Sequence, residues 1–246
     1  MMNMRLLVSP MNLEEAIAAL EGGADIIDVK NPREGSLGAN FPWAIRSVVE
    51  LVAGRAPVSA TIGDLPFKPG TASLAALGAA VSGADYIKAG LLGVSEPGEA
   101  IELLRPIVRS VRDFDSRRKI VAAAYSDFRR AGSLPPLSLP EIAAECGADV
   151  VMVDTAVKDG RSTLEFMAVD ELKMFVDSAH DLGLEAALAG NLGIKDLDAI
   201  RAVSPDILGV RGAVCGGDRN SRIRAELVRA LKNSLAGASE GMPELL

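Results

Sequence analysis

The chain has only one histidine and two cysteines among its 246 residues. Histidine and cysteine are the usual nitrogen and sulfur ligands of transition metals, so a metal site rich in histidine is excluded. The cysteines, Cys146 and Cys215, form no Cys-x-x-Cys pair, and no signal-peptide pattern begins the sequence. We expect a protein of the reducing cytoplasm that binds no metal. Acid–base chemistry then falls to lysine, aspartate, glutamate or tyrosine.

Aromatic residues make up only 4% of the chain, whereas apolar residues make up 49%. The core must therefore be built from Ala, Val, Leu and Ile, a composition typical of a parallel sheet covered by helices. No apolar run approaches the roughly 18 residues that a membrane helix needs. The net charge of -7 argues against broad binding to nucleic acid or to anionic membranes. We expect neither as a partner, while a local phosphate pocket is compatible with this charge.

Strand-like segments alternate with helical segments along the whole chain. We predict strands at residues 4–8, 25–30, 57–62, 85–89, 119–124, 149–153, 185–189 and 206–210. Eight such units favour a single-domain TIM (β/α)8 barrel. A doubly wound open sheet is the alternative, but no Gly-x-Gly-x-x-Gly follows the first strand. We predict one catalytic domain over residues 1–236, a flexible tail over residues 237–246, and long helices at residues 164–182 and 220–235.

A Gly-Ala-Asp motif opens three of the predicted strands, with its aspartate at Asp25, Asp85 and Asp149. Aligned on this motif, Lys88 occupies the position of Asp28, and Asp154 that of Lys30. Side chains two residues apart share one face of a strand. The active site of a TIM barrel lies at the carboxyl ends of its strands. We therefore expect Asp28, Lys30, Lys88 and Asp154 to meet inside the barrel mouth.

Two lysines and two aspartates at one site indicate Schiff-base chemistry. Burial and a neighbouring ammonium both lower the pKa of a lysine, and the neutral amine attacks a carbonyl group. Carboxylates hold the partner lysine charged and shuttle protons. The alternative is a purely structural network of ion pairs. Lys158 lies four positions beyond Asp154, within reach of the same mouth, although a solvated loop lysine is the alternative there.

The loops after the seventh and eighth strands commonly bind phosphate in this fold. Glycines allow backbone N–H groups to approach an anion, and arginine adds a fork of donors. The candidate phosphate-binding residues are Gly190, Asn191, Arg211, Gly212, Gly216, Gly217, Asp218 and Arg219. Glycine-rich turns without a ligand are the alternative. His180 is expected on the outer surface, and Tyr86 between the barrel and its helices.

Several runs of residues resemble a known family. Asp-Val-Lys-Asn-Pro at residues 28–32 and Glu-Gly-Ser-Leu-Gly-Ala-Asn-Phe-Pro-Trp at residues 34–43 are similar to the (5-formylfuran-3-yl)methyl phosphate synthase family. Similar runs also occur at residues 83–88, 154–160, 210–213 and 215–219. The resemblance covers nearly the whole chain, and the loop from Asn31 to Trp43 is highly specific.

This resemblance implies a TIM-barrel lyase acting on phosphates, without a metal or an organic cofactor. It implies that two molecules of glyceraldehyde 3-phosphate condense into the furan precursor of methanofuran or methylofuran, with loss of phosphate and water. By the same resemblance, Lys30 forms the Schiff base and Lys88 is the proton acceptor. Asp28, Asp154 and Lys158 are further active-site residues.

Two other functions stay open on the sequence. A class I aldolase on sugar phosphates would use the same lysine but release a linear product without losing phosphate. A non-catalytic sugar-phosphate sensor would use the charged cluster for binding alone. A homo-oligomer is compatible with the Ala-rich helix predicted at residues 71–82, although that helix is equally suited to packing within one subunit.

Overall fold

The eight predicted strands form a closed parallel barrel in strict chain order, and the prediction of a TIM barrel is confirmed. A computed structural model describes residues 4–64 and 67–237. The strands are β1 (Arg5–Val8), β2 (Ile26–Val29), β3 (Val58–Thr61), β4 (Tyr86–Gly90), β5 (Lys119–Tyr125), β6 (Val150–Asp154), β7 (Glu185–Leu188) and β8 (Ile207–Val210). Pairing of β1 with β8 closes the ring. The predicted tail falls almost wholly on residues 238–246, outside the described residues.

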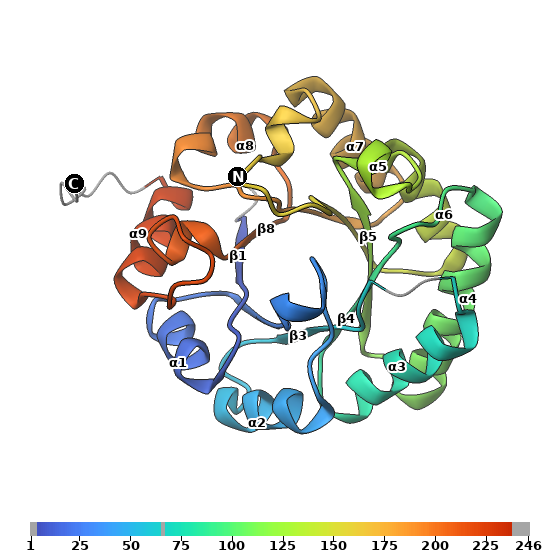
Figure 1. The fold of residues 1–246 in the computed structure, drawn as a ribbon, viewed down its shortest axis with the longest axis horizontal. Coiled ribbons are helices and arrows are strands. Elements are labelled where there is room, and N and C mark those ends of the chain that lie inside the picture. The colour runs from blue at the N-terminus through green and yellow to red at the C-terminus, as the bar shows by residue number, and fades with distance from the viewer. Residues whose placement is uncertain (1–3, 65–66, 238–246) are drawn as a thin grey trace.

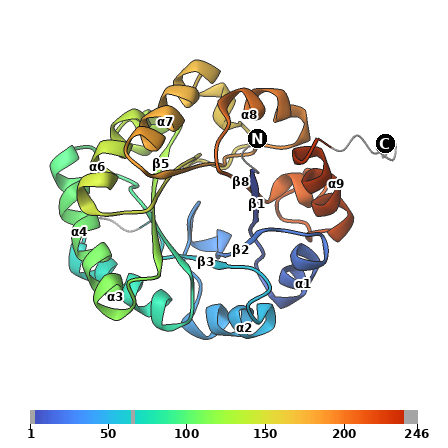
Figure 2. The ribbon, with the colours of Figure 1, turned by 180° about the vertical axis from the view of Figure 1, so that it is seen from behind.

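Helices surround the barrel on its outside, as Figures 1 and 2 show from opposite ends. They are α1 (Leu13–Glu21), α2 (Pro42–Val52), α3 (Pro69–Val81), α4 (Pro97–Phe114), α5 (Phe128–Ala131), α6 (Leu139–Cys146), α7 (Val169–Asp181), α8 (Leu197–Val203) and α9 (Ala225–Leu235). Short 3-10 helices are η1 (Pro32–Glu34), η2 (Pro136–Ser138), η3 (Thr163–Glu165), η4 (Ile194–Asp196) and η5 (Gly212–Val214). Both faces of every strand are therefore covered, as an all-parallel sheet requires.

Alternating side chains of the strands build two separate apolar cores. On β1, Leu6 and Val8 belong to the larger core between strands and helices, whereas Leu7 belongs to the smaller core inside the barrel. Tyr86 also lies in the inner core, so its predicted place between barrel and helices is wrong. It precedes Lys88 by two residues on β4, and residues so spaced share one face.

An aspartate fastens the start of every even strand to the strand before it. Its backbone N–H donates to the carbonyl oxygen of one residue of that strand, and its Oδ2 accepts the N–H of the same residue. The pairs are Asp25 with Leu6, Asp85 with Val58, Asp149 with Ile120, and Asp206 with Ala186. Three of these aspartates belong to the Gly-Ala-Asp motif. The fourth follows Ser204 and Pro205 instead of Gly-Ala, so the motif does not predict it.

Two predicted helices begin later than expected. The one predicted at residues 164–182 divides into η3 and α7, because Glu171 accepts the backbone N–H of Ala168 and caps a new helix there. The helix predicted from residue 220 begins at Ala225. Asp218 instead binds the N–H of Asn220 and the hydroxyl of Ser221, which holds these residues in a turn.

The long loop after β2 folds into the barrel mouth. It is the blue segment inside the ring of strands in Figures 1 and 2. We name residues 31–40 the barrel plug. Leu37 is fully buried in the inner core, Ser36 Oγ donates to the Thr155 carbonyl at 2.7 Å, and Thr61 Oγ1 donates to the Gly38 carbonyl at 2.7 Å. The plug thus spans from β2 to the end of β6 and fills the side of the mouth near β3, β4 and β5.

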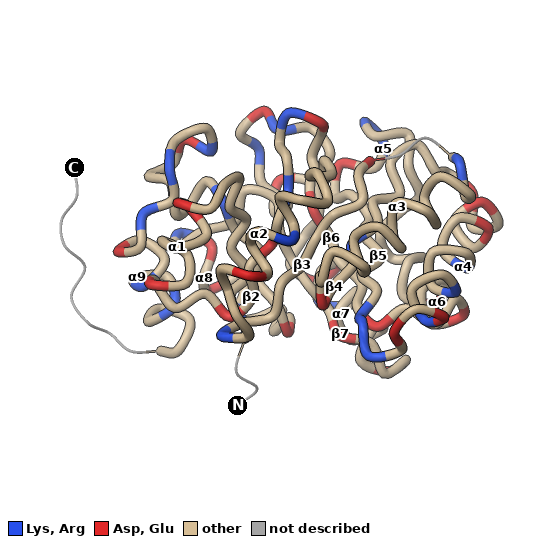
Figure 3. The backbone as a smooth tube through the Cα atoms, turned by 90° about the horizontal axis from the view of Figure 1, so that it is seen from below, with Lys and Arg blue, Asp and Glu red and all other residues tan. Residues whose placement is uncertain are grey.

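Charged residues of both signs are interspersed along the outer helices and loops (Figure 3). His180 is half-buried on α7, where its Nε2 lies 2.9 Å from Oδ2 of Asp206. Among the described residues, no helix is both long enough and apolar enough to cross a membrane.

Candidate active site

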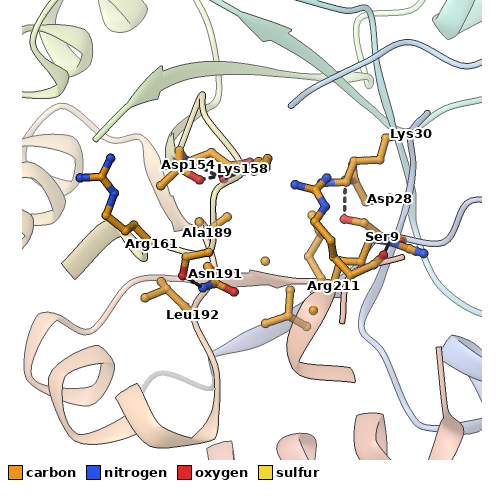
Figure 4. Close-up of a pocket in the computed structure, with 18 of the residues that line it drawn as sticks. Ser9, Asp28, Lys30, Asp154, Lys158, Arg161, Ala189, Asn191, Leu192 and Arg211 are labelled. Carbon is orange, nitrogen blue, oxygen red and sulfur yellow. Dashed lines mark hydrogen bonds and ion pairs between the residues drawn. The ribbon is translucent and has the colours of Figure 1, made fainter. Parts of the chain in front are cut away.

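A cavity of about 240 Å³ opens at the carboxyl ends of the strands, beside the plug. Figure 4 shows the side chains that face one another across it. The predicted site residues that line it are Asp28, Lys30, Lys88, Asp154, Lys158, Gly190, Asn191, Arg211, Gly212, Gly217, Asp218 and Arg219. Gly216 does not line it and is exposed. The structure therefore brings together nearly the whole predicted set.

Asp28 and Lys88 form a buried ion pair at the base of the cavity. Lys88 Nζ lies 2.8 Å from Asp28 Oδ1, and the two side chains are 1% and 0% exposed. Ser59 Oγ donates to the same carboxylate oxygen at 2.7 Å, and Ser9 Oγ donates to Oδ2 at 2.9 Å. Burial alone would raise the pKa of Asp28, but the charges of Lys88 and Lys30 and these hydrogen bonds lower it overall. The carboxyl group is thus held ionised.

Asp154 and Lys158 form a second ion pair on the β6 side of the cavity. Lys158 Nζ lies 2.5 Å from Asp154 Oδ1 and 3.0 Å from the hydroxyl of Thr155. Burial works to raise the pKa of Asp154, but the charges of Lys158 and Lys30 outweigh it and lower that pKa. The prediction that Lys158 reaches the mouth is confirmed by this contact, and the solvated-lysine alternative is wrong.

Lys30 differs from the other two lysines of the cavity. Its side chain is only 7% exposed, yet within the described part of the chain its Nζ has no hydrogen-bond or ion-pair partner. Burial lowers its pKa from 10.5 to about 8; the charges of Lys158 and Lys88 add to this effect, and those of Asp154 and Asp28 oppose it. Lys30 is therefore the amine most readily available in neutral form as a nucleophile.

The two predicted phosphate-binding arginines have different surroundings. All five N–H groups of Arg211 are engaged, with Glu15, with the Ser9 carbonyl, and with the carbonyls of Arg219 and Ser221. Arg211 therefore fastens the β8 loop to the first βα unit and has no donor left for a ligand. Arg219 is half-buried at the cavity, where burial lowers its pKa while the Asp154 charge opposes this effect. Its side chain makes no hydrogen bond within the described residues.

The glycines of the β7 and β8 loops meet real conformational demands. Gly190 has a φ of +94°, and a Cβ there would collide with the Thr163 hydroxyl and lie 3.0 Å from the Thr155 backbone nitrogen. Gly217 has a φ of +96°. Both positions require glycine for the chain to turn beside the cavity. The backbone of these loops therefore approaches any ligand more closely than other residues would allow.

The sequence is similar to those of known proteins along nearly its whole length. The family model described as 4-HFC-P synthase matches residues 6–232. The chain is 62% identical to the (5-formylfuran-3-yl)methyl phosphate synthase of Methanosarcina acetivorans, over 93% of this chain and 97% of that protein. It is 57% identical to the Archaeoglobus fulgidus protein of the same name, over 95% of this chain and all of that one.

The chain belongs to the (5-formylfuran-3-yl)methyl phosphate synthase family. The family resemblance predicted from the sequence is confirmed, and the chain is thus a member of a family of synthases.

Solved structures share the fold of this synthase family member at low sequence identity. Phosphoribosyl anthranilate isomerase from Thermus thermophilus superimposes with a TM-score of 0.62 at 19% identity, over 95% of this chain and 99% of that one. A dihydrodipicolinate synthase gives a TM-score of 0.66 at 16% identity, over 96% of this chain and 77% of that one. These similarities show the TIM-barrel fold alone.

Some cavity residues of this synthase family member were not predicted from the sequence. Ser9, Met152 and Thr155 line the cavity, and Glu15 fixes Arg211 from outside it. Ser9 lies two residues after Leu7 at the end of the first strand, so strand alternation could have predicted that it faces the barrel interior. Glu15 carries no such signal. Within residues 4–64 and 67–237, no group of three or more His, Cys, Asp or Glu side chains is arranged to hold a metal ion.

Proposed function

We propose that this protein condenses two molecules of glyceraldehyde 3-phosphate into (5-formylfuran-3-yl)methyl phosphate through a Schiff base on Lys30. The observation that carries this proposal is the environment of Lys30, a buried amine with a pKa of about 8. Among the described residues it has no ion-pair partner, and it lies at a cavity with two lysine–aspartate pairs. The name shared by the curated relatives supports the product.

The first stage activates one triose phosphate. Lys30 Nζ adds to its aldehyde carbon, and loss of water gives a protonated Schiff base. This cation acidifies the proton on C2. Lys88, which has given its own proton to the departing hydroxyl group, accepts the C2 proton, and the Asp28 carboxylate stabilises the ammonium that forms. The electron pair left on C2 expels phosphate from C3. The product of this stage is an unsaturated iminium ion whose C3 accepts a nucleophile.

The second stage joins the two trioses. The branched skeleton of the product requires the new bond to link C3 of the first triose to C2 of the second. Removal of the C2 proton of the second triose gives an enediolate that attacks this carbon. The oxygen on C2 of the first triose then adds to the aldehyde of the second, and two dehydrations give the furan. Hydrolysis of the Schiff base frees the formyl group, so two triose phosphates give one furan phosphate, one phosphate and two waters.

The two ion pairs have separate tasks in this proposal. Lys88 moves the proton, and the Asp28 carboxylate, which its lowered pKa keeps ionised, holds and stabilises the ammonium form of Lys88. The Asp154 and Lys158 pair sets the charge around Lys30, since both groups alter the pKa of that amine. Arg219 and the backbone of Gly190, Gly212 and Gly217 hold the phosphate that is retained. Gly216 and Asp218 support the shape of that loop, and Asn191 closes its rim.

The test is to incubate the protein with glyceraldehyde 3-phosphate, with and without borohydride, and to record intact mass and ultraviolet spectra. The expected result is a furan absorbance and free phosphate without borohydride, and a reduced adduct on Lys30 with it. Lys158→Met is the matched control and should still give the Lys30 adduct. An adduct without the furan band would identify a simple aldolase. No adduct and no product would refute the Schiff-base mechanism.

A further inference from the structure

Leu37 of the barrel plug is a loop residue that lies in the core of the barrel. Its side chain is fully buried in the inner apolar core. Three other members of that core, Leu7, Met152 and Ala189, line the cavity. The plug also adjoins the cavity through Ser36, whose hydroxyl donates to the carbonyl of Thr155, a residue of the cavity wall. Leu37 therefore lies directly behind the cavity wall.

Space for Leu37 is provided by a glycine on β4. Gly90 stands five residues after Asp85, where the repeated motif has Lys30 after Asp25 and Asp154 after Asp149. A Cβ at Gly90 would collide with the Tyr125 hydroxyl and lie 2.6 Å from Asp64 Oδ1 and 3.0 Å from Leu37 Cδ1. The space that a side chain would take at this position is thus occupied by Tyr125, Asp64 and Leu37 together.

Polar groups hold Leu37 in this place. Asp64 Oδ2 accepts the backbone N–H of Leu37 at 3.0 Å, and its Oδ1 accepts the hydroxyl of Tyr125. Thr61 fixes the next residue, through the hydrogen bond to the Gly38 carbonyl. The backbone of Leu37 therefore cannot move away from a larger ligand without breaking these bonds, and its side chain is packed in the inner core.

We propose that Leu37 is a specificity-determining residue that limits the substrates of the cavity to three-carbon sugar phosphates. The proposal rests on the proposed function, because it concerns the same cavity and the same substrate class. An additional hydroxymethylene group that extended toward β4 would meet Leu37. Truncation of Leu37 opens space toward Gly90 and the hydroxyl of Tyr125, where a polar group can hydrogen-bond.

The experiment measures dissociation constants by calorimetry for glycerol 3-phosphate and erythritol 4-phosphate, which have no aldehyde and cannot react. The wild-type protein should bind the three-carbon compound more tightly, and Leu37→Ala should shift the ratio of the two constants by about tenfold toward the four-carbon compound. Leu104→Ala removes an equally buried leucine from the outer core and should leave the ratio unchanged. Circular dichroism reports whether each variant is folded, and Leu37→Val, with a smaller shift in the same direction, replaces Leu37→Ala if the latter is unfolded.

An unchanged ratio in a folded Leu37 variant, an equal shift in Leu104→Ala, or equal binding of both compounds by the wild type would overturn this proposal. Failure of the wild-type protein to form a furan would refute the proposed reaction instead, because the binding ratio does not depend on turnover. As a second readout, erythrose 4-phosphate mixed with glyceraldehyde 3-phosphate should give a product one CH2O unit heavier with Leu37→Ala alone.

Discussion

The two sides of the barrel mouth each hold a carboxylate but surround it with different partners. On the cavity side, Asp28 is bound by an ammonium group and two hydroxyl groups. On the plug side, Asp64 is bound by a tyrosine hydroxyl and a backbone N–H. The Tyr125 hydroxyl has its pKa raised well above 10 by burial and by the Asp64 charge, so it stays protonated.

This difference distinguishes a carboxylate of the candidate active site, Asp28, from one that stabilises the structure, Asp64. Lys30 and Lys88, the lysines near Asp28, line the cavity, where a ligand can reach them, whereas neutral donors satisfy the half-buried Asp64 carboxylate. A carboxylate at the barrel mouth therefore belongs to the candidate active site or to the structure alone according to the groups beside it. Substitutions on both sides test this difference.

The largest effect is expected for Lys30→Met on the cavity side. Removal of the nucleophile should lower turnover by about 10⁴-fold or more, measured as furan formation. The same change should raise the free energy of unfolding at pH 7 by on the order of 2 kcal/mol, because the folded state lowers the pKa of Lys30 from 10.5 to about 8.

The sign of this stability change follows from proton binding. Below pH 8 the lysine is charged in both states, so the folded state bears the full cost of burying an ammonium. Between pH 8 and 10.5 the unfolded state binds more protons, so the wild type gains stability and the advantage of Lys30→Met shrinks. Urea unfolding of the wild type and of Lys30→Met at pH 7 and pH 10 measures this change in the stability difference. An advantage that grows with pH would contradict the buried-ammonium assignment.

A direct comparison of the two sides is Asp28→Asn against Asp64→Asn. Asp28→Asn should lower turnover by about 100-fold, because Lys88 loses the carboxylate that holds and stabilises its ammonium form. Asp64→Asn should lower the free energy of unfolding by about 1–3 kcal/mol through weakened hydrogen bonds, with turnover within a few-fold of the wild type. Steady-state rates measure the turnover of each variant, and urea unfolding measures its stability. Equal losses of turnover would mean that the plug side takes part in the chemistry.

The pH dependence of adduct formation on Lys30 should respond in opposite directions to its two charged neighbours. In the wild type, the rate of borohydride-trapped adduct should rise with pH and level off above about 8, as the amine becomes neutral. Asp154→Asn removes a negative charge that raises the pKa of Lys30, so the midpoint should move to lower pH. Lys158→Met removes a positive charge that lowers it, so the midpoint should move to higher pH. Shifts of the same sign would show that these charges do not control Lys30.

The smallest effect is expected for Ser9→Ala. Loss of one hydrogen bond to Asp28 should raise the activation free energy by about 1 kcal/mol. This corresponds to about a fivefold fall in kcat, with little change in KM. Ser110→Ala, whose hydroxyl bonds backbone carbonyls at the outer helices, is the control and should have no effect on kcat. A change in KM alone would place Ser9 in ligand binding instead.

The sequence was most informative where the regular alternation of a strand carried the signal. Strand alternation and the Gly-Ala-Asp motif correctly grouped Asp28, Lys30, Lys88 and Asp154. In a parallel barrel, alternate residues of each strand face the interior, so matching positions on different strands meet there. The ion pair of Arg211 with Glu15 could not be predicted from the sequence, because the two residues are 196 positions apart and neither position shows a periodic pattern. The inward fold of the plug was equally hidden, because a polar loop with several glycines does not indicate which way a single leucine will point.

The four aspartates that fasten the even strands also impose a pseudo-fourfold symmetry on the site at the opposite end of the barrel. Five residues beyond each of them stand Lys30, Gly90, Asp154 and Arg211, near the carboxyl ends of their strands. These four positions hold a buried amine, a glycine, a carboxylate and an arginine that anchors the β8 loop. Because each βαβα quarter keeps its own register, the chemistry of one quarter can change while the other three stay in place.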